Sequence, residues 1–434
     1  MKNGLNRRNF IKNSAMGLVG GGLIRSDLFG GDEKKADKEN EVISIKDHRM
    51  LGRTGFKVSD ISIGYSNNTQ VIRTALESGI NYIDTAESYK NQKIVGEAIK
   101  DIGREKIFIT SKLEIKKDKS EAGFIKRFNK CLKELDTDYI DCMMIHSAES
   151  IEILKTPGFH SAMEQMKKEG KLKHIGVSNH GSNWYQAPKV TMATILNEAV
   201  KDGRFDVILM AYNFIQQDLG AEVIENCRKE NIGVTLMKVN PVGKYYIIRD
   251  RIKKLEEEGK KVHPLFREGL IRFKKKAEFA DGFIKKYDLN NPREISDGAV
   301  KYVLGNSGVS SVVCSIKNFD DIDEFIGLSG TRLSEPENEK LSYYKEGPGK
   351  LYCRHGCNEC ESSCPEELKI NDILRFNHYY DAHQREKYAI KKYLSLNGKD
   401  ARHCLDCEGY CESSCPYGLP VQGLLSMAHD NLTI

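Results

Sequence analysis

The middle of the chain repeats one unit eight times: a short apolar run followed by an amphipathic, helix-forming segment. Runs of this length, rich in β-branched residues, are typical of buried strands. We expect the strands at 61–65, 82–86, 107–112, 139–146, 172–179, 207–213, 233–238 and 309–316. Strands that alternate with helices pair in parallel, and eight such units can close into a (β/α)8 barrel. An open doubly wound sheet is the alternative, but no Gly-x-Gly-x-x-Gly follows the first strand. The sequence therefore predicts an α/β fold of the TIM-barrel type.

The barrel is expected over residues 48–330, with one insertion between its last two strands. This insertion, 245–287, is rich in Lys, Arg and Glu and has apolar residues at helical spacing. One or two amphipathic helices are predicted there. They would form either a lid or substrate-specificity element over the barrel mouth, or a docking surface for the cysteine-rich part of the chain that follows.

The amino terminus has the features of a targeting segment. Arg7 and Arg8 precede a phenylalanine, a lysine and a short, glycine-rich apolar stretch. Residues 1–29 resemble a twin-arginine export signal, and the stretch is too short for an ordinary membrane span. Residues 30–47 are highly charged and predict a flexible linker. The expected location is the periplasm, with a membrane tether only if the signal stays uncleaved.

The charge pattern bears on partners. The net charge is +5, but basic and acidic residues are interleaved rather than gathered in stripes. A solvated surface is predicted, and a nucleic-acid partner is not expected.

Three consecutive barrel strands end in residues that can do chemistry. Asp84 lies near the end of the second strand with Tyr89 five residues further on, Lys112 ends the third and His146 ends the fourth. The carboxyl ends of barrel strands are where such folds place their active sites. Each residue alone has an ordinary structural explanation, for example helix capping by Asp84 or core packing by His146. Together, with the motif Asn-Tyr-Ile-Asp-Thr-Ala-Glu-x-Tyr intact, they resemble the catalytic tetrad of the aldo/keto reductases.

The resemblance implies a carbonyl–alcohol interconversion. Tyr89 would donate the proton in reduction and accept it in oxidation. The Lys112 ammonium would lower the phenol's pKa, Asp84 would hold Lys112 in place and charged, and His146 would orient the carbonyl oxygen.

The same resemblance implies a nicotinamide cofactor, NADP or NAD. Ser178 and Asn179, at the end of the fifth strand, would bind the nicotinamide carboxamide, with Asn213 or Gln216 nearby. Met237 and Lys238 stand where many relatives carry an aromatic that stacks on the ring. The segment of Ser315, Lys317 and Asn318 would bind the adenosine end, with Lys317 either attracting a 2′-phosphate or remaining a solvated lysine.

Cysteines are concentrated near the carboxyl terminus. Of the 12 in the chain, four (Cys131, Cys142, Cys227 and Cys314) are scattered in apolar contexts and predict packing residues. The other eight form two runs that share the phrase Cys-Glu-Ser-Ser-Cys-Pro: Cys353, Cys357, Cys360 and Cys364, then Cys404, Cys407, Cys411 and Cys415. Such short gaps predict metal binding rather than disulfides.

Runs of this kind resemble those of bacterial ferredoxins, which bind two [4Fe–4S] clusters. The resemblance implies that the fourth cysteine of each run ligates the other run's cluster. The predicted ligand sets are Cys353, Cys357, Cys360 and Cys415, and Cys404, Cys407, Cys411 and Cys364. A helical stretch over 370–396 separates the runs, so residues 345–434 predict a mainly helical ferredoxin-like domain. Two four-thiolate zinc sites are the alternative.

The sequence thus predicts an exported aldo/keto reductase that acts on a small carbonyl or alcohol, with iron–sulfur clusters that have a redox partner protein or a structural role. Two alternatives remain. One is an electron-transfer protein whose barrel is not catalytic, and the other is a binding module with a zinc-stabilised tail.

Overall fold

The computed structural model describes residues 43–115, 118–181, 190–242, 245–246, 249–250, 253–254, 257, 264–381, 383 and 385–433, of which 264–270 and 272–273 by their backbone. Residues from Ile43 onward form one compact unit. The predicted export signal and most of the predicted linker lie outside the described residues.

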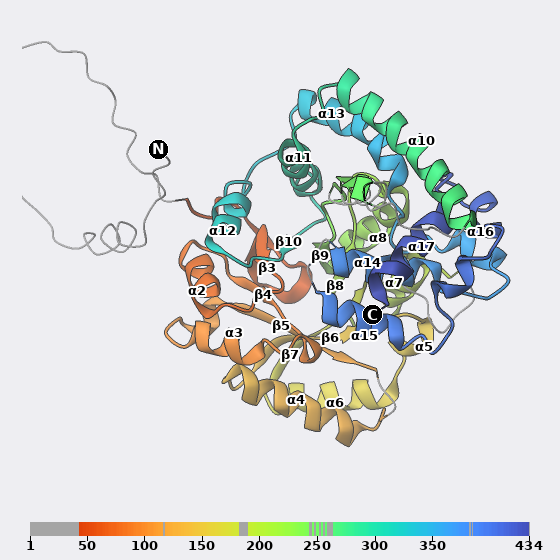
Figure 1. The fold of residues 1–434 in the computed structure, drawn as a ribbon. Coiled ribbons are helices and arrows are strands. Elements are labelled where there is room, and N and C mark those ends of the chain that lie inside the picture. The colour runs from red at the N-terminus through yellow and green to blue at the C-terminus, as the bar shows by residue number, and fades with distance from the viewer. Residues whose placement is uncertain are drawn as a thin grey trace, which may run out of the picture. The chain divides into compact units, whose positions relative to one another are not determined.

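Eight parallel strands form a closed barrel (Figure 1). They are β3 (Ile61–Ile63), β4 (Tyr82–Asp84), β5 (Phe108–Glu114), β6 (Ile140–His146), β7 (Leu172–Asn179), β8 (Val207–Ala211), β9 (Gly233–Met237) and β10 (Ser311–Cys314). The last strand closes the ring: Val312 pairs with Ile61 on one side and with Leu236 on the other. The predicted (β/α)8 barrel is therefore confirmed.

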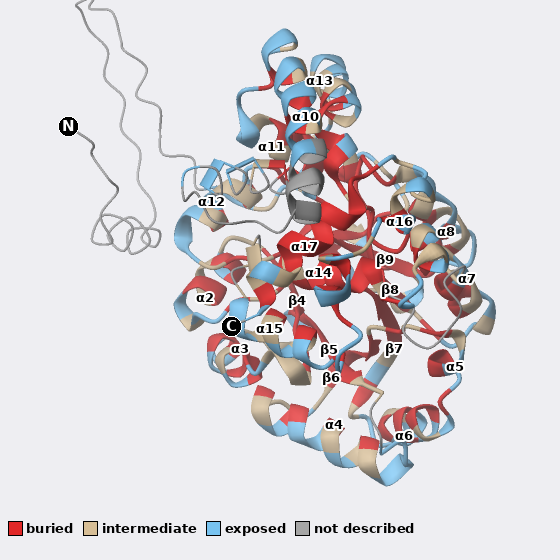
Figure 2. Ribbon diagram, turned by 45° about the vertical axis from the view of Figure 1, so that its right-hand side comes forward, coloured by how far each residue is buried: buried red, intermediate tan, exposed pale blue. Residues whose placement is uncertain are grey.

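Helices surround the strands and bury their apolar sides against them, as the red inner faces in Figure 2 show. They are α2 (Thr69–Glu77), α3 (Gln92–Ile99), α4 (Glu121–Leu135), α5 (Ile151–Leu154), α6 (Pro157–Lys168), α7 (Met192–Asp202), α8 (Gln217–Lys229), α11 (Pro292–Leu304) and α12 (Phe319–Ile326). Several begin at a capping side chain. Asn68, for example, accepts hydrogen bonds from the backbone of Gln70 and Val71.

A hairpin closes the amino-terminal end of the barrel. It consists of β1 (His48–Met50) and β2 (Lys57–Ser59), joined through the short 3-10 helix η1 (Gly52–Thr54). Gly52 has φ +50°, and a Cβ there would lie 2.2 Å from the backbone nitrogen of Gly233, the first residue of β9. The close approach requires glycine.

The segment after the barrel is mainly helical. It comprises α13 (Glu335–Glu346), η4 (Pro348–Leu351), η5 (Glu359–Ser363), α14 (Ile370–Asp381), α15 (Glu386–Leu394), η6 (Ala401–Cys404), α16 (Tyr410–Ser413) and α17 (Val421–Leu432). The single helical stretch expected over 370–396 is two helices. Arg385 lies in the turn between them, where its backbone nitrogen donates to the carbonyl of Tyr379.

The two cysteine runs fold alike. In the first, Glu361 accepts a hydrogen bond from the backbone nitrogen of Asn371, at the start of α14. In the second, Glu412 accepts the equivalent bond from Gln422, at the start of α17. Between the runs, the hydroxyls of Ser363 and Ser414 are 2.5 Å apart. The repeated phrase in the sequence thus corresponds to a repeated structure.

The insertion is described mainly through α10 (Pro264–Lys286), which contacts η4 and α17. Its side chains of Ala277, Ala280 and Ile284 are buried in a second apolar cluster, which also holds Tyr344 and Leu351. Of the two roles left open for the insertion, its described part has the contacts of a docking surface.

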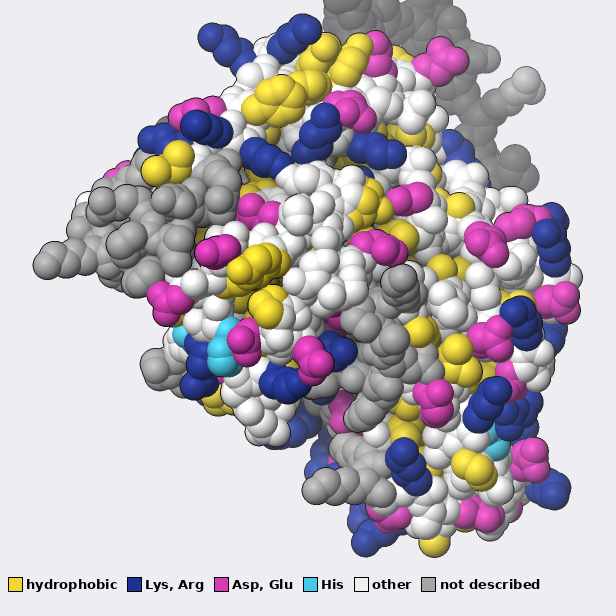
Figure 3. All heavy atoms as spheres, turned by 90° about the vertical axis from the view of Figure 1, so that its right-hand side faces the viewer, with side chains coloured by type: hydrophobic (Ala, Val, Ile, Leu, Met, Phe, Trp, Pro, Cys, Tyr) yellow, Lys and Arg dark blue, Asp and Glu magenta, His cyan; other side chains and the backbone are white. Residues whose placement is uncertain are grey.

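The surface mixes charges. On the face drawn in Figure 3, Lys and Arg side chains lie among Asp and Glu side chains. No helix within the described ranges is both long and apolar enough to span a membrane. The four scattered cysteines, Cys131, Cys142, Cys227 and Cys314, are free thiols in the buried core, as predicted.

Candidate active site and cysteine sites

The strand order brings three of the four predicted tetrad residues together. Strand β5 pairs with β4 on one side and β6 on the other, so Lys112 lies between Asp84 and His146. The Lys112 Nζ donates to Asp84 Oδ2 at 2.5 Å and to the carbonyl of Thr85 at 2.8 Å. All three tetrad side chains are buried.

Tyr89 joins them from η2 (Glu87–Tyr89), the 3-10 turn after β4. The Lys112 Nζ lies 4.7 Å from the centroid of the Tyr89 ring, and the His146 ring centroid lies 5.7 Å from it. The hydroxyl of Ser88 is 3.4 Å from His146 Nδ1. The four side chains that the sequence singled out therefore meet at the carboxyl end of the barrel.

Burial dominates the electrostatics of this group. It raises the pKa of the Asp84 carboxyl and lowers the pKa of the Lys112 ammonium, while the attraction between the two opposes both shifts. Burial, reinforced by the charge of Lys112, also holds the pKa of His146 well below its usual value. The imidazole is therefore neutral at physiological pH.

Tyr89 departs from the expected direction. Burial and then the Asp84 carboxylate raise its pKa above the usual value for a phenol, and Arg385 is the cation that counteracts them. Lys112 is not among the main influences on this pKa: its ammonium is bonded to Asp84, and burial of the ring dominates.

The carboxyl-terminal segment reaches into the site, which the sequence did not reveal. The guanidinium carbon of Arg385 lies 5.2 Å from the Tyr89 ring centroid and 4.2 Å from that of Tyr388. Further along, the hydroxyl of Tyr379 on α14 is 3.1 Å from Nδ1 of His180, whose ring lies 5.6 Å from that of His146. The contacts of Arg385 with Tyr89 and of Tyr379 with His180 join residues about two hundred or more positions apart, and no local motif announces them.

The predicted nicotinamide residues at the end of β7 are buried and bonded within the chain. The Ser178 hydroxyl accepts from the backbone of Ser147 and donates to Ile145. The Asn179 amide donates to Ala148 and accepts from Gly181. As folded, both side chains order the surrounding loops.

The side chains of Gln216 and Asn213 differ in whether their oxygen atoms are already hydrogen-bonded. The Asn213 amide nitrogen donates to the Tyr352 hydroxyl and to the carbonyl of Lys238, and its oxygen accepts from backbone nitrogens. The Oε1 of Gln216, in contrast, is buried without a hydrogen-bond partner in the described part of the chain. A buried acceptor of this kind is available to a ligand.

The remaining predicted cofactor residues lie around the mouth. Met237 ends β9, and Lys238 Nζ donates to the carbonyl of His180 at 2.8 Å. Lys317 Nζ donates to the carbonyl of His383, in the carboxyl-terminal segment. Asn318 caps α12, and Ser315 is half-buried beside it. Lys238, Ser315, Lys317 and Asn318 thus follow strands β9 and β10, which end at the same face of the barrel.

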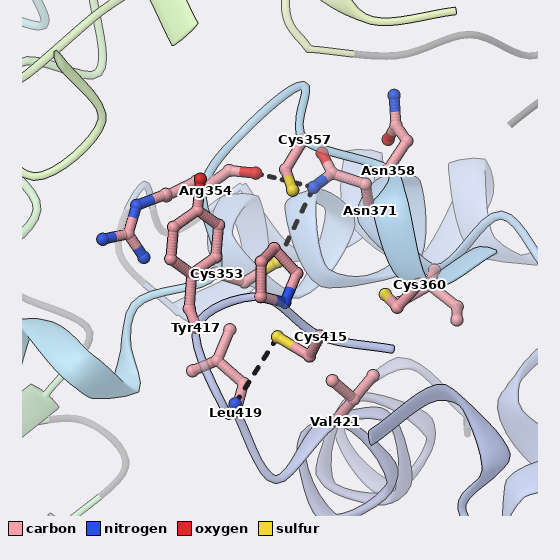
Figure 4. A pocket seen from close by; sticks show the side chains of 12 residues that line it. Cys353, Arg354, Cys357, Asn358, Cys360, Asn371, Cys415, Tyr417, Leu419 and Val421 are labelled. Carbon is pink, nitrogen blue, oxygen red and sulfur yellow. Dashed lines mark hydrogen bonds between the residues drawn. The ribbon is translucent and has the colours of Figure 1, made fainter. Parts of the chain in front are cut away.

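The first cysteine site is a hollow that is partly open to solvent (Figure 4). Four of its lining residues are Cys353, Cys357, Cys360 and Cys415, the set predicted for one cluster. Its other walls include apolar side chains such as Ile370 and Val421. Two thiols accept hydrogen bonds: Cys353 from the Asn371 amide and Cys415 from the backbone of Leu419.

The other four thiols are also neighbours. Burial and then the nearby thiols of Cys411, Cys364 and Cys407 raise the pKa of Cys404. Burial and Cys364 likewise raise the pKa of Cys411 to about 12. Among the residues that the structure describes, no three His, Cys, Asp or Glu side chains gather around the position of a single metal ion.

Comparison with known proteins gives the family. Residues 50–344 match the aldo/keto reductase family. A probable aldo-keto reductase from Glycine max is 26% identical over 319 residues, which cover 67% of this chain and 86% of that protein. A glyoxal reductase from Bacillus subtilis is 38% identical over 31% of this chain and 49% of its own length. A methylglyoxal reductase from Salmonella typhi is 36% identical over 25% of this chain and 41% of its own length.

Among solved structures, an aldo-keto reductase from Bacillus halodurans is similar to this chain with a TM-score of 0.48 and 20% identity, over 70% of this chain and 96% of that one. The family match covers well over half of the chain. The chain therefore belongs to the aldo/keto reductase family, whose members are oxidoreductases that act on carbonyl and alcohol groups.

Proposed function

We propose that this protein interconverts a small carbonyl compound and its alcohol with NADP(H), or with NAD(H), and that Tyr89 is the general acid and base. The observation that carries the proposal is the convergence of Asp84, Lys112, His146 and Tyr89 at the carboxyl end of a barrel of this family.

Each side chain has a part in moving the proton. Reduction places a hydride on the carbonyl carbon and a proton on its oxygen, and the protonated Tyr89 hydroxyl supplies the proton. Neutral His146 donates a hydrogen bond to the same oxygen and orients the substrate. Asp84 and Lys112 fix one another behind Tyr89 through a bond of 2.5 Å. In oxidation the Tyr89 phenolate takes the proton back.

A nicotinamide cofactor would supply the hydride. The unpaired Oε1 of Gln216 suits a carboxamide N–H donor, and the ammonium groups of Lys238 and Lys317 suit phosphates. We propose these three residues as cofactor contacts alongside Ser178, Asn179, Met237, Ser315 and Asn318.

The substrate class is proposed from relatives. The matched relatives include reductases of glyoxal and methylglyoxal, which are small reactive carbonyl compounds. Substrates of comparable size are the first to test.

Replacing one oxygen tests the acid role. Tyr89→Phe is expected to abolish carbonyl turnover because the ring stays and the proton donor is lost. Tyr343→Phe, on α13 far along the chain, is the matched control and should retain full turnover. The visible absorbance of the protein should be the same in both variants. Full activity in Tyr89→Phe would remove Tyr89 from the role of general acid.

We further propose two [4Fe–4S] clusters, one on Cys353, Cys357, Cys360 and Cys415 and one on Cys364, Cys404, Cys407 and Cys411. In support, the first four thiols line one hollow, and in the second set the neighbouring thiols help to raise the pKa of Cys404 and Cys411. Clusters would carry single electrons, with a redox partner protein, or hold the segment together.

Metal analysis tests the clusters. Anaerobically purified protein is expected to contain about eight iron atoms and eight labile sulfides per chain. Cys415→Ser and Cys364→Ser should each remove about half of the iron, because each is expected to open a different cluster. Stoichiometric zinc in place of iron would refute the proposal.

We propose lastly that the protein is exported by the twin-arginine route, since Arg7 and Arg8 stand at the head of the signal-like segment. Substituting both by lysine should keep the protein in the cytoplasm, as cell fractionation would measure. Unchanged export would exclude this route. If NADP(H) is bound, we expect it to travel with the folded protein.

A further inference from the structure

One face of α15 (Glu386–Leu394) and its cap meets the barrel mouth. Tyr388 and Lys392 are four residues apart and so lie on the same side of the helix, and Arg385 precedes the helix as its cap. All three are half-buried, whereas Lys387 and Lys391, on the remaining surface of α15, are exposed. The helix therefore directs two cations and a tyrosine toward the candidate active site.

Three tyrosine rings surround the end of Arg385. Its guanidinium carbon lies 4.9 Å from the ring centroid of Tyr65, 4.2 Å from that of Tyr388 and 5.2 Å from that of Tyr89. Aromatic faces stabilise a cation at such distances and hold the planar group in a defined position. The guanidinium is thus fixed next to the phenol that we propose as the proton donor.

The guanidinium has donors to spare. It carries five N–H groups, yet no described side chain or carbonyl accepts a hydrogen bond from it, and no described carboxylate pairs with it. Arg375, on the neighbouring α14, shows the contrast: it pairs with Asp372 at 3.0 Å and with Glu149 at 3.6 Å. Asp84, the one carboxylate of the tetrad, is already bonded to Lys112.

The surrounding charges also favour an anion. After burial, the charges of Lys112, Lys392, Arg385 and Arg375 lower the pKa of His146, which identifies them as the cations whose field reaches the site. Two of these, Lys112 and Arg375, are neutralised by acidic partners. Arg385 and Lys392 have no acidic partner within the described ranges, so both cations remain without an ion pair beside the site.

We propose that Arg385 binds an anionic group of the substrate, so that the enzyme acts on small carbonyl compounds that carry a carboxylate, such as 2-oxo acids, or a phosphate. The planar fork of donors matches either group in a bidentate manner. With the anion at Arg385, a neighbouring carbonyl would lie beside Tyr89, whose ring centroid is 5.2 Å from the guanidinium carbon. This inference rests on the proposed carbonyl reduction and names its substrate class.

The assignment links the two halves of the compact unit. The barrel supplies the tetrad, and the segment that carries the cysteine runs supplies the group that selects the substrate. The phosphates of a nicotinamide dinucleotide are the other source of the same chemistry. Arg385 lies against Tyr89, however, whereas Lys317, the residue predicted for a 2′-phosphate, bonds to His383.

A binding experiment on the full chain tests the proposal without turnover. Calorimetry would compare oxamate, which has the carboxylate of a 2-oxo acid, with oxamide, its neutral counterpart, and with inorganic phosphate. We expect the wild type to bind oxamate or phosphate at least about tenfold more tightly than oxamide. Arg385→Gln should weaken anion binding by about tenfold or more. Lys391→Gln, which removes an exposed lysine of the same helix, should bind as the wild type does.

Arg385→Lys separates loss of the anion site from misfolding. It keeps the charge and loses the fork, so its anion affinity should lie between those of the wild type and Arg385→Gln, with the circular dichroism and iron content of the wild type. If Arg385→Gln bound oxamate and phosphate as tightly as Lys391→Gln does, the proposal would be overturned. The absence of anion binding in the wild type would also overturn it. Weaker NADP⁺ binding in Arg385→Gln with unchanged oxamate binding would assign the residue to the cofactor and also overturn it.

The outcome is separable from that for Tyr89. If Tyr89→Phe retained turnover, the acid role would fail, while the oxamate comparison would still decide the role of Arg385. If Tyr89→Phe lost turnover and Arg385→Gln bound oxamate normally, the proposed carbonyl reduction would be supported. The proposed anionic substrate class would then be wrong.

Discussion

Tyr89 shows how a single residue's chemistry depends on what covers it. A phenol beside an ammonium would ordinarily become more acidic. Here the ammonium of Lys112 is bonded to Asp84, and the Arg385 guanidinium lies 5.2 Å from the centroid of the buried Tyr89 ring. Burial and the Asp84 charge therefore raise the pKa of Tyr89. The Tyr89 hydroxyl therefore keeps its proton at neutral pH and releases it to water only with difficulty.

This direction predicts an asymmetric pH dependence. Because carbonyl reduction uses protonated Tyr89, its rate should be flat from about pH 6 to about pH 9, and His146, whose pKa is lowered, should not titrate in that range. Alcohol oxidation uses the phenolate, so its rate should rise about tenfold per pH unit without a plateau in the same range. Steady-state rates in both directions would measure this. A plateau in the oxidation rate near neutral pH would show that Lys112 does lower the pKa of Tyr89.

At the scale of elements, the strands and their ends could be predicted because their signals are local. Asp84, Lys112 and His146 each stand at the end of an apolar run, and parallel pairing brings such ends together in any closed barrel. The described strands near the mouth are in places shorter than expected: β3 ends at Ile63 rather than at Tyr65, and β8 at Ala211 rather than at Asn213. Tyr65 and Asn213, which were expected in these strands, instead lie in the loops at the mouth of the barrel.

The elements that cover the mouth could not be predicted. Arg385 lies in a turn inside a stretch that reads as one helix, and its contact with Tyr89 joins positions about three hundred residues apart. Its partners, Tyr65 and Tyr388, have no distinguishing motif. The grouping of Cys415 with the first cysteine run, in contrast, was predicted from the ferredoxin resemblance, which assigns the fourth cysteine of each run to the other run's site.

One junction between elements can be tested with a glycine. Gly181, just after β7, has φ +89°, and a Cβ there would lie 2.5 Å from the backbone nitrogen of Gly356, in the first cysteine run. Gly170 has φ +71° but has no atom within 4 Å of its Cβ position, so it reports backbone strain alone. Gly170→Ala should cost about 1–2 kcal/mol of unfolding free energy. Gly181→Ala should cost more, by about 1–3 kcal/mol, and should lower the iron content.

Urea unfolding and iron analysis of the two variants would measure the difference. Equal stability and equal iron content would mean that the first cysteine run is not held against β7 in solution.

At the scale of the whole molecule, the barrel and the cysteine segment share a core. One apolar cluster lies within the barrel, and a second combines α10 and α11 with the carboxyl-terminal helices. Figure 2 shows α14 and α17 as largely buried. The sequence divided this region into a barrel ending at 330 and a domain starting at 345, and the described residues form one compact unit. Because the second cluster contains residues of both parts, we expect the barrel and the cysteine segment to need each other for stability.

A truncation tests this dependence. A chain that ends at Glu346 keeps every barrel strand but exposes the apolar faces of α10, α11 and α13, including Ala280, Ile295 and Tyr344. Exposed patches of this kind lead to aggregation, so we expect little soluble protein by size-exclusion chromatography. A chain that starts at Ile43 keeps the whole compact unit and should remain soluble. A soluble, monomeric product ending at Glu346 with Tyr89-dependent turnover would show instead that the barrel is independent and that Arg385 is dispensable for catalysis.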